Sequence, residues 1–278
     1  MDNTDADADA DGDTITGYQA ERTDGILCAH RPGIEWLSSG WNGGRSRTDR
    51  AFNVSVPEGW CCDNLDRYVE ERLERAGFAD GRHDRPVLLT GVDLAHARGA
   101  RCGSVTVYAT AGISNPAALP MDPDGGLLPD GRLESDSLER SEGSNSGNGG
   151  DDGDEGGSER HAGTVNLIVG TTHALEAGAL ESLLAVAAEA KAATLLARTG
   201  FPGTTTDAIV VGHDPSGSDR AFSGSATAVG AAARACVREA ITASLASRYE
   251  GTDATIPASV SAAEYGVSTD ARATVFRL

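Results

Sequence analysis

Lys191 is the single lysine of the chain, and it lies in a stretch rich in alanine and leucine, residues 183–193. A desolvated ammonium group can stabilise negative charge that develops in a reaction, or act as a base once its pKa is lowered. A structural ion pair with a distant carboxylate is the alternative interpretation. Glu189 is two positions away, on nearly the opposite side of a helix, so these two side chains each need a partner elsewhere.

A second group of polar residues is concentrated in a loop that leads into an apolar strand, expected over residues 207–212. The group comprises Thr204, Thr205, Thr206 and Asp207. A polar loop that leads into a buried strand is typical of a functional site. His213 and Asp214 close the same strand, and His173 closes the neighbouring one. Because the chain has neither H-E-x-x-H nor H-x-H spacing, we predict no metal site.

A glycine-rich turn follows the strand expected over residues 34–38. It comprises Trp41, Asn42, Gly43 and Gly44. Such a turn tolerates positive φ angles and can present backbone N–H groups to an oxygen-rich ligand, although an ordinary turn is the alternative. All three tryptophans, Trp36, Trp41 and Trp60, lie in this part of the chain. Their flat faces suit an extended ligand, and core packing is the alternative for at least one of them.

Three asparagines lie within or at the ends of apolar strands, namely Asn53, Asn115 and Asn166. A buried carboxamide costs a few kcal/mol unless it has hydrogen-bond partners. These side chains are therefore candidates for binding a ligand, and capping of loops is the alternative.

The composition indicates adaptation to molar salt. The 278 residues carry a formal net charge of −19, and since there is one lysine, 22 of the 23 basic residues are arginine. Exchange of lysine for carboxylates favours a hydrated surface in high salt, so we expect a cytoplasmic protein of a haloarchaeal type. The acidity disfavours nucleic acid as a partner. Neither a signal peptide nor a membrane span is expected, and the five cysteines predict neither disulfides nor zinc.

The pattern of apolar residues predicts one α+β (mixed α/β) domain, with a mixed sheet packed by long helices. Strands are expected at 25–30, 34–38, 51–56, 86–91, 104–110, 164–170 and 207–212, and helices at 63–76, 175–198 and 226–247. We predict a disordered acidic tail over 1–16, one domain over 17–250 with a disordered insert at 121–162, and a C-terminal extension over 251–278.

Nucleotide-binding and α/β-hydrolase motifs are missing from the sequence, so reasoning from single residues ends at a polar pocket. Six segments in order carry more information: 37–44 (LSSGWNGG), 90–93 (TGVD), 110–115 (TAGISN), 163–166 (GTVN), 189–191 (EAK) and 203–209 (GTTTDAI). Together, from about residue 25 to residue 247, they resemble the adenosylcobinamide amidohydrolase family. Departures from the family pattern are expected at Ser114, Pro116 and His173.

The resemblance implies hydrolysis of the amide that joins the aminopropanol arm to adenosylcobinamide, in corrinoid salvage for cobalamin biosynthesis. The phosphorylated cobinamide is a second candidate substrate. The implied catalytic residues are Lys191, Asp207, Glu189, Asn166 and His213, with Asp207 or His213 as the base and Lys191 and Asn166 facing the oxyanion. The implied substrate-binding residues are Trp41, Asn42, Gly43, Gly44, Asn53, Asp93, Asn115, Thr204, Thr205 and Thr206. No cofactor is expected, and metal dependence and oligomeric state stay open.

Three alternatives remain. Self-cleavage between Gly163 and Thr164, directly after the insert, would create an N-terminal threonine that is both nucleophile and base. A corrinoid carrier without chemistry would need the same pocket but neither Lys191 nor Asp207. A regulatory module would place the function in the acidic insert.

Overall fold

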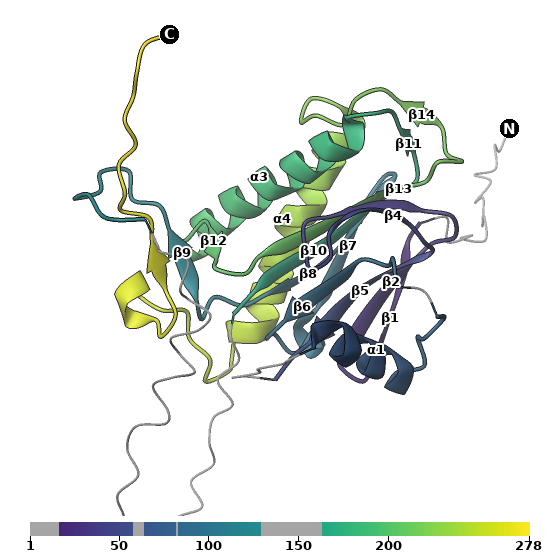
Figure 1. Cartoon of the computed structure of the whole chain (residues 1–278), viewed down its shortest axis with the longest axis horizontal. Helices are drawn as coiled ribbons and strands as arrows, with labels where there is room; N and C mark the ends of the chain where they lie inside the picture. Colours follow the sequence, from purple (N-terminus) through teal and green to yellow (C-terminus); the bar gives the residue numbers. More distant parts are fainter. Residues whose placement is uncertain (1–16, 58–63, 82, 129–162) are drawn as a thin grey trace, which may run out of the picture.

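Two β-sheets stack face to face in the centre of the structure (Figure 1). The computed structural model describes residues 17–57, 64–81, 83–128 and 163–278. The first sheet has the strand order β1-β2-β5-β6 and comprises β1 (Gln19–Thr23), β2 (Ile26–His30), β5 (Arg50–Ser55) and β6 (Val87–Thr90). The sequence pattern predicted most of these strands but assigned them to a single sheet.

The second sheet has the order β4-β3-β13-β10-β8-β7. It comprises β4 (Gly44–Arg47), β3 (Glu35–Ser38), β13 (Ala208–His213), β10 (Val165–Thr171), β8 (Val105–Ala111) and β7 (Arg98–Cys102). β10 and β13 are parallel, and the other pairs of this sheet are antiparallel. Mixed sheets with long helices confirm the predicted α+β class.

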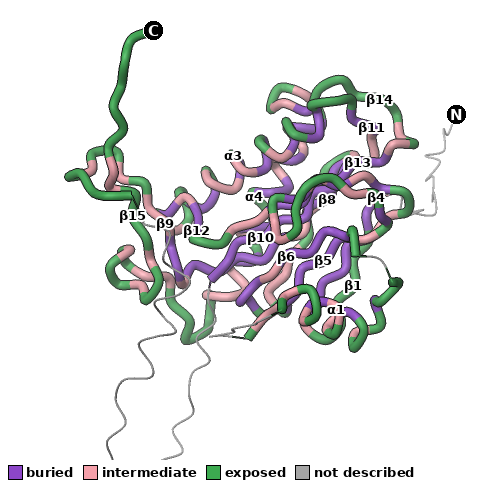
Figure 2. Tube along the Cα trace, in the orientation of Figure 1, coloured by how far each residue is buried: buried purple, intermediate pink, exposed green. Residues whose placement is uncertain are grey.

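Helices cover the outer faces of the two sheets, so the fold has four layers (Figure 1). α1 (Leu65–Arg75) packs on the first sheet through Val69 and Leu73. α3 (Ala179–Thr199) and α4 (Ala228–Tyr249) pack on the second. Every residue of β10 is consequently buried, as Figure 2 shows. The sequence of such a strand is a nearly continuous run of apolar residues because both of its faces are covered.

Helix α3 starts later than the sequence pattern predicted. We expected a helix from residue 175, but Leu175 belongs to β11 (Ala174–Leu175), which pairs with β14 (Asp219–Arg220). Gly178 precedes α3 with a φ of 84°, and Gly200 follows it with a φ of 79°. Glycine adopts this left-handed conformation readily, which fixes both ends of the helix.

A small third sheet joins the C-terminal segment to the main body. Its order is β12-β9-β15, with β12 (Gly203–Thr204), β9 (Pro116–Ala118) and β15 (Val267–Ser268). Two short 3₁₀ helices, η1 (Leu94–His96) and η2 (Val260–Ala262), complete the elements. Arg272 donates hydrogen bonds to Asp122 and Pro123, at the start of the predicted insert. The rest of that insert from residue 129, and the predicted tail over 1–16, lie outside the described residues.

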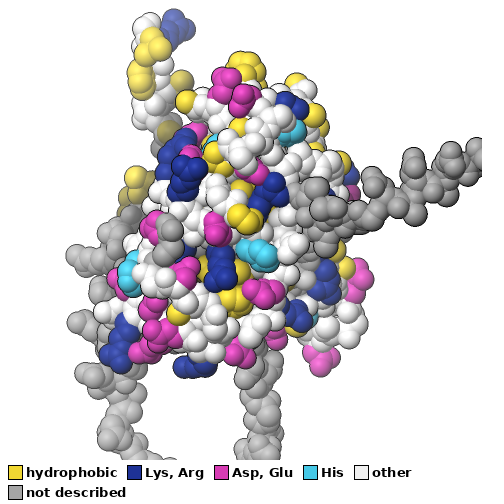
Figure 3. Space-filling model, turned by 90° about the vertical axis from the view of Figure 1, so that its right-hand side faces the viewer, with side chains coloured by type: hydrophobic (Ala, Val, Ile, Leu, Met, Phe, Trp, Pro, Cys, Tyr) yellow, Lys and Arg dark blue, Asp and Glu magenta, His cyan; other side chains and the backbone are white. Residues whose placement is uncertain are grey.

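Charged side chains of both signs intermingle on the face drawn in Figure 3. The described part of the chain contains no helix long and apolar enough to cross a membrane.

Two glycines make room for aromatic residues between the stacked sheets. Gly170 of β10 and Gly212 of β13 are register partners. A Cβ atom on Gly212 would lie 2.5 Å from the Trp36 ring, and one on Gly170 would overlap the ring of Tyr18. Trp36 is fully buried there and donates a 2.7 Å hydrogen bond from Nε1 to the carbonyl of Thr48. Core packing, the alternative weighed for the tryptophans, therefore holds for Trp36.

Replacing Trp36 by alanine should lower the free energy of unfolding by about 3–5 kcal/mol, because it leaves a cavity between the sheets. Guanidinium unfolding at multimolar KCl measures the change. Phe222→Ala is the matched control, since Phe222 is 75% exposed and its loss should cost less than about 0.5 kcal/mol. Equal effects of the two substitutions would contradict the packing described.

Candidate active site

Polar side chains from distant parts of the chain meet where β10 and β13 begin. The two strands are parallel, with Asn166 opposite Ala208, so the residues that precede them lie at the same edge of the second sheet. Asp207 directly precedes β13, and Thr164 directly precedes β10. In a parallel pair, corresponding strand ends meet at one edge, which explains why two loops 42 positions apart share one site.

Asp207 is the centre of this cluster. Its Oδ1 accepts hydrogen bonds from the backbone N–H of Val165 (2.9 Å) and from Oγ1 of Thr204 (2.5 Å). Its Oδ2 accepts from the backbone N–H of Thr204 (3.1 Å) and from Nζ of Lys191. Since a carboxylate has about four acceptor positions, all of them are occupied. Asp207 is therefore held rigidly and fixes the Lys191 ammonium in turn.

Lys191 reaches the cluster from α3. Its side chain is 12% exposed and that of Asp207 is 10% exposed. Gly203 makes this approach possible, because a Cβ atom there would lie 2.7 Å from Oδ2 of Asp207 and 3.4 Å from Nζ of Lys191. The structural interpretation of Lys191 is confirmed, since it pairs with a carboxylate. The pair lies within the predicted polar cluster, and the catalytic role of Lys191 stays a prediction.

Hydroxyl groups surround the ion pair. The Oγ1 atoms of Thr164 and Thr206 are 2.9 Å apart and share a hydrogen bond. Asn115 donates from Nδ2 to Oγ1 of Thr205 (2.5 Å), and its own carbonyl accepts from the backbone N–H of Thr205 (3.2 Å). Oδ1 of Asn115 is buried and has no hydrogen-bond partner among the described residues. An unpaired buried acceptor is costly, so it is a position where a ligand N–H would be stabilised.

The other two asparagines connect the stacked sheets. Asn53 of β5 donates from Nδ2 to Oγ1 of Thr110 (3.0 Å) and accepts from Nδ2 of Asn166 (3.0 Å). Asn166 also donates to the carbonyl of Leu89 (2.8 Å) and accepts from the backbone N–H of Ala208 (3.2 Å). Because both N–H groups of its carboxamide are engaged, Asn166 has none left for an oxyanion. Its contacts hold the chain next to Asp207.

The glycine-rich turn and Asp93 lie at the same end of the sheets. Ser39, just before the turn, donates its backbone N–H to the carbonyl of Ile209 (2.9 Å) and accepts from the Ile209 N–H through Oγ (3.0 Å). Asn42 has a φ of 48° and donates to Asp66. Asp93 caps η1 by accepting from the N–H of Ala95 (2.7 Å). Ser39 thus ties the start of the turn to β13, whereas Trp41 packs against the core under α1. Trp60 lies outside the described residues.

His213 lies at the far end of β13, roughly 20 Å from Asp207 at ~3.3 Å per residue. Its Nδ1 accepts from the backbone N–H of Leu175 (3.0 Å), so that nitrogen carries no proton. His173 is its neighbour, and burial with the nearby Arg220 lowers the pKa of His173. Burial acts to raise the pKa of Asp214, but hydrogen bonds from Ser216 and Arg31 outweigh it and hold that pKa below its ordinary value. The structure does not bring His213 together with Lys191.

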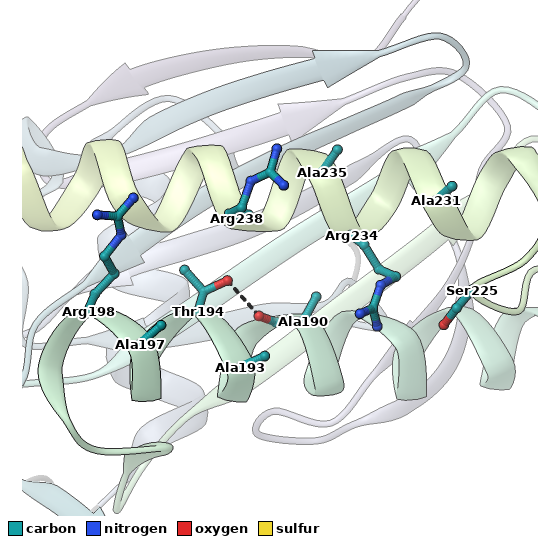
Figure 4. Close-up of a pocket in the computed structure, with 10 residues that line it drawn as sticks. All are labelled: Ala190, Ala193, Thr194, Ala197, Arg198, Ser225, Ala231, Arg234, Ala235 and Arg238. Atoms are coloured by element: carbon teal, nitrogen blue, oxygen red, sulfur yellow. Dashed lines mark hydrogen bonds between the residues drawn. The ribbon is translucent and has the colours of Figure 1, made fainter.

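Glu189 also lies away from the cluster. Its side chain is 61% exposed and pairs with Arg234 of α4 at 2.8 Å, so the prediction that Glu189 and Lys191 need separate partners is confirmed. Nearby, a groove of about 560 Å³ runs between the outer faces of α3 and α4. In Figure 4, Arg198 and Arg234 extend between the two helices, and Arg238 and several alanine side chains also line the groove. The described residues that line this groove include no carboxylate, so it offers none of the chemistry of the Lys191 cluster.

Metal ligands and cysteines do not gather at the site. The described residues contain no group of three His, Cys, Asp or Glu side chains suited to a metal ion. Burial raises the pKa of the Cys28 thiol to about 12 and that of Cys236 to about 11, which makes both poor nucleophiles. Cys102 is exposed, and Cys61 and Cys62 lie outside the described residues.

Comparison with known proteins shows which family the chain belongs to. The sequence profile of adenosylcobinamide amidohydrolases matches residues 8–253. Adenosylcobinamide amidohydrolase of Halobacterium salinarum is 55% identical over 260 residues, which cover 94% of this chain and 99% of that protein. The protein of the same name from Methanosarcina mazei is 25% identical over 182 residues, 65% of this chain and 70% of that one. The resemblance seen in the six sequence segments is confirmed: the chain belongs to the adenosylcobinamide amidohydrolase family, a family of amide hydrolases.

Proposed function

We propose that the chain hydrolyses the amide that joins the aminopropanol arm to adenosylcobinamide. The products are adenosylcobyric acid and (R)-1-amino-2-propanol, and the reaction serves corrinoid salvage for cobalamin biosynthesis. The observation that carries the proposal is the nearly buried Lys191–Asp207 ion pair, whose carboxylate also accepts a hydrogen bond from the Thr204 hydroxyl. The hydroxyl pair of Thr164 and Thr206 lies next to it in the chain. The substrate class follows from the names of the two relatives.

Amide hydrolysis needs a nucleophile, a positive group near the developing oxyanion, and a proton for the departing amine. Lys191 suits the last two tasks, because its ammonium has two N–H donors beyond the one that Asp207 accepts. Asp207 suits a positioning role, since its four acceptor positions are filled. We assign the same kind of role to Asn166, which is the register partner of Ala208 and accepts its backbone N–H beside the ion pair. His213 and Glu189 take no part in this proposal because they lie elsewhere.

The residues around the ion pair suit a large, flat substrate with amide groups. Oδ1 of Asn115 would accept an N–H of the substrate, and the hydroxyls of Thr204, Thr205 and Thr206 would contact it next to Lys191. The turn formed by Trp41, Asn42, Gly43 and Gly44 would offer backbone N–H groups and the part of the Trp41 indole that is not packed against the core under α1. Asp93 stays a substrate-binding candidate, whereas Asn53 is buried and would act by positioning Asn166 through its bonds to Thr110 and Asn166. Cobinamide phosphate carries the same scissile amide and is a second substrate to test.

Release of aminopropanol from adenosylcobinamide in multimolar KCl, followed by mass spectrometry with and without a chelator, tests the activity. Lys191→Ala and Asp207→Asn should each slow release by about 10²–10⁴-fold, the range of proton-transfer catalysis, while corrinoid binding measured by absorbance persists. Arg234→Ala is the matched control, because it removes a partly exposed cation of the neighbouring helix that lies away from the cluster. Tight binding without release by folded wild-type protein would make it a carrier and end the enzymatic proposal.

The ion pair should also contribute to stability. Measuring the stability of variants distinguishes a loss of catalysis from a loss of folded protein. Lys191→Met should lower the free energy of unfolding by about 3 kcal/mol, because it leaves the buried Asp207 carboxylate without its cation. Arg234→Met should cost less than about 1 kcal/mol, since its partner Glu189 is exposed. Guanidinium unfolding of both variants at the same KCl concentration gives the comparison, and equal costs would show that Lys191 is solvated.

A further inference from the structure

We infer that the chain cleaves itself between Gly163 and Thr164, and that Thr164, once N-terminal, supplies the nucleophile of the amide hydrolysis. The second half of this inference rests on the proposed function. Thr164 is 4% exposed and directly precedes β10, the central strand of the second sheet that lies beside β13. A threonine is activated as a nucleophile by its own amino group when it is N-terminal.

The surroundings of Thr164 are those of a reacting group. Its Oγ1 lies 2.9 Å from Oγ1 of Thr206, the residue before Asp207. The next backbone N–H, that of Val165, donates to Oδ1 of Asp207, whose other oxygen holds Lys191. One carboxylate therefore connects the backbone after Thr164 with the nearly buried ammonium. The four filled acceptor positions of Asp207 make it a poor general base, so the cluster calls for another group that can accept a proton.

The backbone on both sides of Thr164 lies against the 112–114 segment. On the C-terminal side, the backbone N–H of Gly112 donates to the carbonyl of Thr164 at 3.2 Å. On the N-terminal side, a Cβ atom on residue 163 would lie 2.6 Å from the carbonyl oxygen of Gly112 and would collide with the backbone N of Ser114. Only glycine fits at position 163, so the residues on either side of the scissile bond are closely packed. Restricted geometry of this kind favours an intramolecular reaction.

The cleavage balances without any co-reactant except water. Oγ1 of Thr164 attacks the carbonyl carbon of Gly163, the C–N bond to Thr164 breaks, and the hydroxyl proton moves to the nitrogen that becomes the α-amine. The ester that remains between Gly163 and Oγ1 is then hydrolysed by water, which yields the Gly163 carboxylate and restores the hydroxyl. The substrate amide would follow the same course, with aminopropanol as the leaving amine and the corrinoid acid as the acyl group.

Burial of both residues makes the origin of any cut identifiable. Gly163 and Thr164 are buried in the described structure, and proteases act on exposed loop segments. A cut at this bond in folded protein is therefore expected to come from the chain itself.

The experiment is intact-mass analysis and N-terminal sequencing of the denatured, freshly purified full chain. Wild type and Thr164→Ser should each give two fragments, the second starting at residue 164, whereas the isosteric Thr164→Val should stay a single chain. The matched control is Thr171→Val at the other end of β10, which also follows a glycine and is fully buried. That control should be cut as wild type is. Circular dichroism at multimolar KCl establishes that each variant is folded.

The outcomes separate this inference from the proposed function. A folded wild-type chain that stays intact overturns self-cleavage, and if it still releases aminopropanol the hydrolase function stands without it. Cutting of Thr164→Val at the same bond also overturns it, because the hydroxyl is then not needed. Cleaved protein that binds but does not hydrolyse adenosylcobinamide would retain self-cleavage and refute the role of Thr164 in the proposed reaction.

Discussion

The parallel pairing of β10 with β13 is the constraint on which the site depends. It sets Asn166 opposite Ala208 and so places the residues before each strand side by side. The crossover between the two strands contains α3, and this helix delivers Lys191 to the same edge. A shift of register by one residue would turn every side chain of a strand to the other face. The Lys191–Asp207 ion pair, the hydrogen bond between Thr164 and Thr206, and the hydrogen bond between Asn53 and Asn166 would then all be lost.

Hydrogen bonds made by Asn53 and Asn166 keep the stacked sheets in one relative position. Apolar contacts between sheets are not directional and tolerate small slides, whereas hydrogen bonds have narrow geometry. The bonds from Asn53 to Thr110 and from Asn166 to Asn53 and Leu89 cross from one sheet to the other close to the site. Since the side chains of Asn53, Asn166 and Thr110 are paired with one another or with the backbone, the arrangement avoids the free-energy cost of unsatisfied donors.

The sequence predicted much of this arrangement because its signals were local. A lone lysine in an apolar helix and a polar loop before an apolar strand pointed to Lys191 and to residues 204–207, and the structure brings these together. The pattern of apolar residues could not assign the strands to two sheets, because a buried strand has the same apolar sequence in either sheet. The family resemblance implied catalytic roles for Glu189 and His213, but Glu189 points away from Lys191 on the helix and His213 lies at the opposite end of its strand. Thr164 entered only as an alternative, since one threonine beside a glycine is a weak signal.

The third sheet has a consequence for the end of the chain. β15 pairs with β9 at Ala117, and β9 pairs on its other side with β12, where Thr204 contacts Asp207. Residues beyond α4 are thus two strands away from the ion pair. β9 lies between β12 and β15, so it is the mechanical link between the C-terminal segment and the loop that carries Thr204. A displacement of β15 would reach that loop through the hydrogen bonds of a β-ladder, without any side chain of the C-terminal segment touching Lys191 or Asp207.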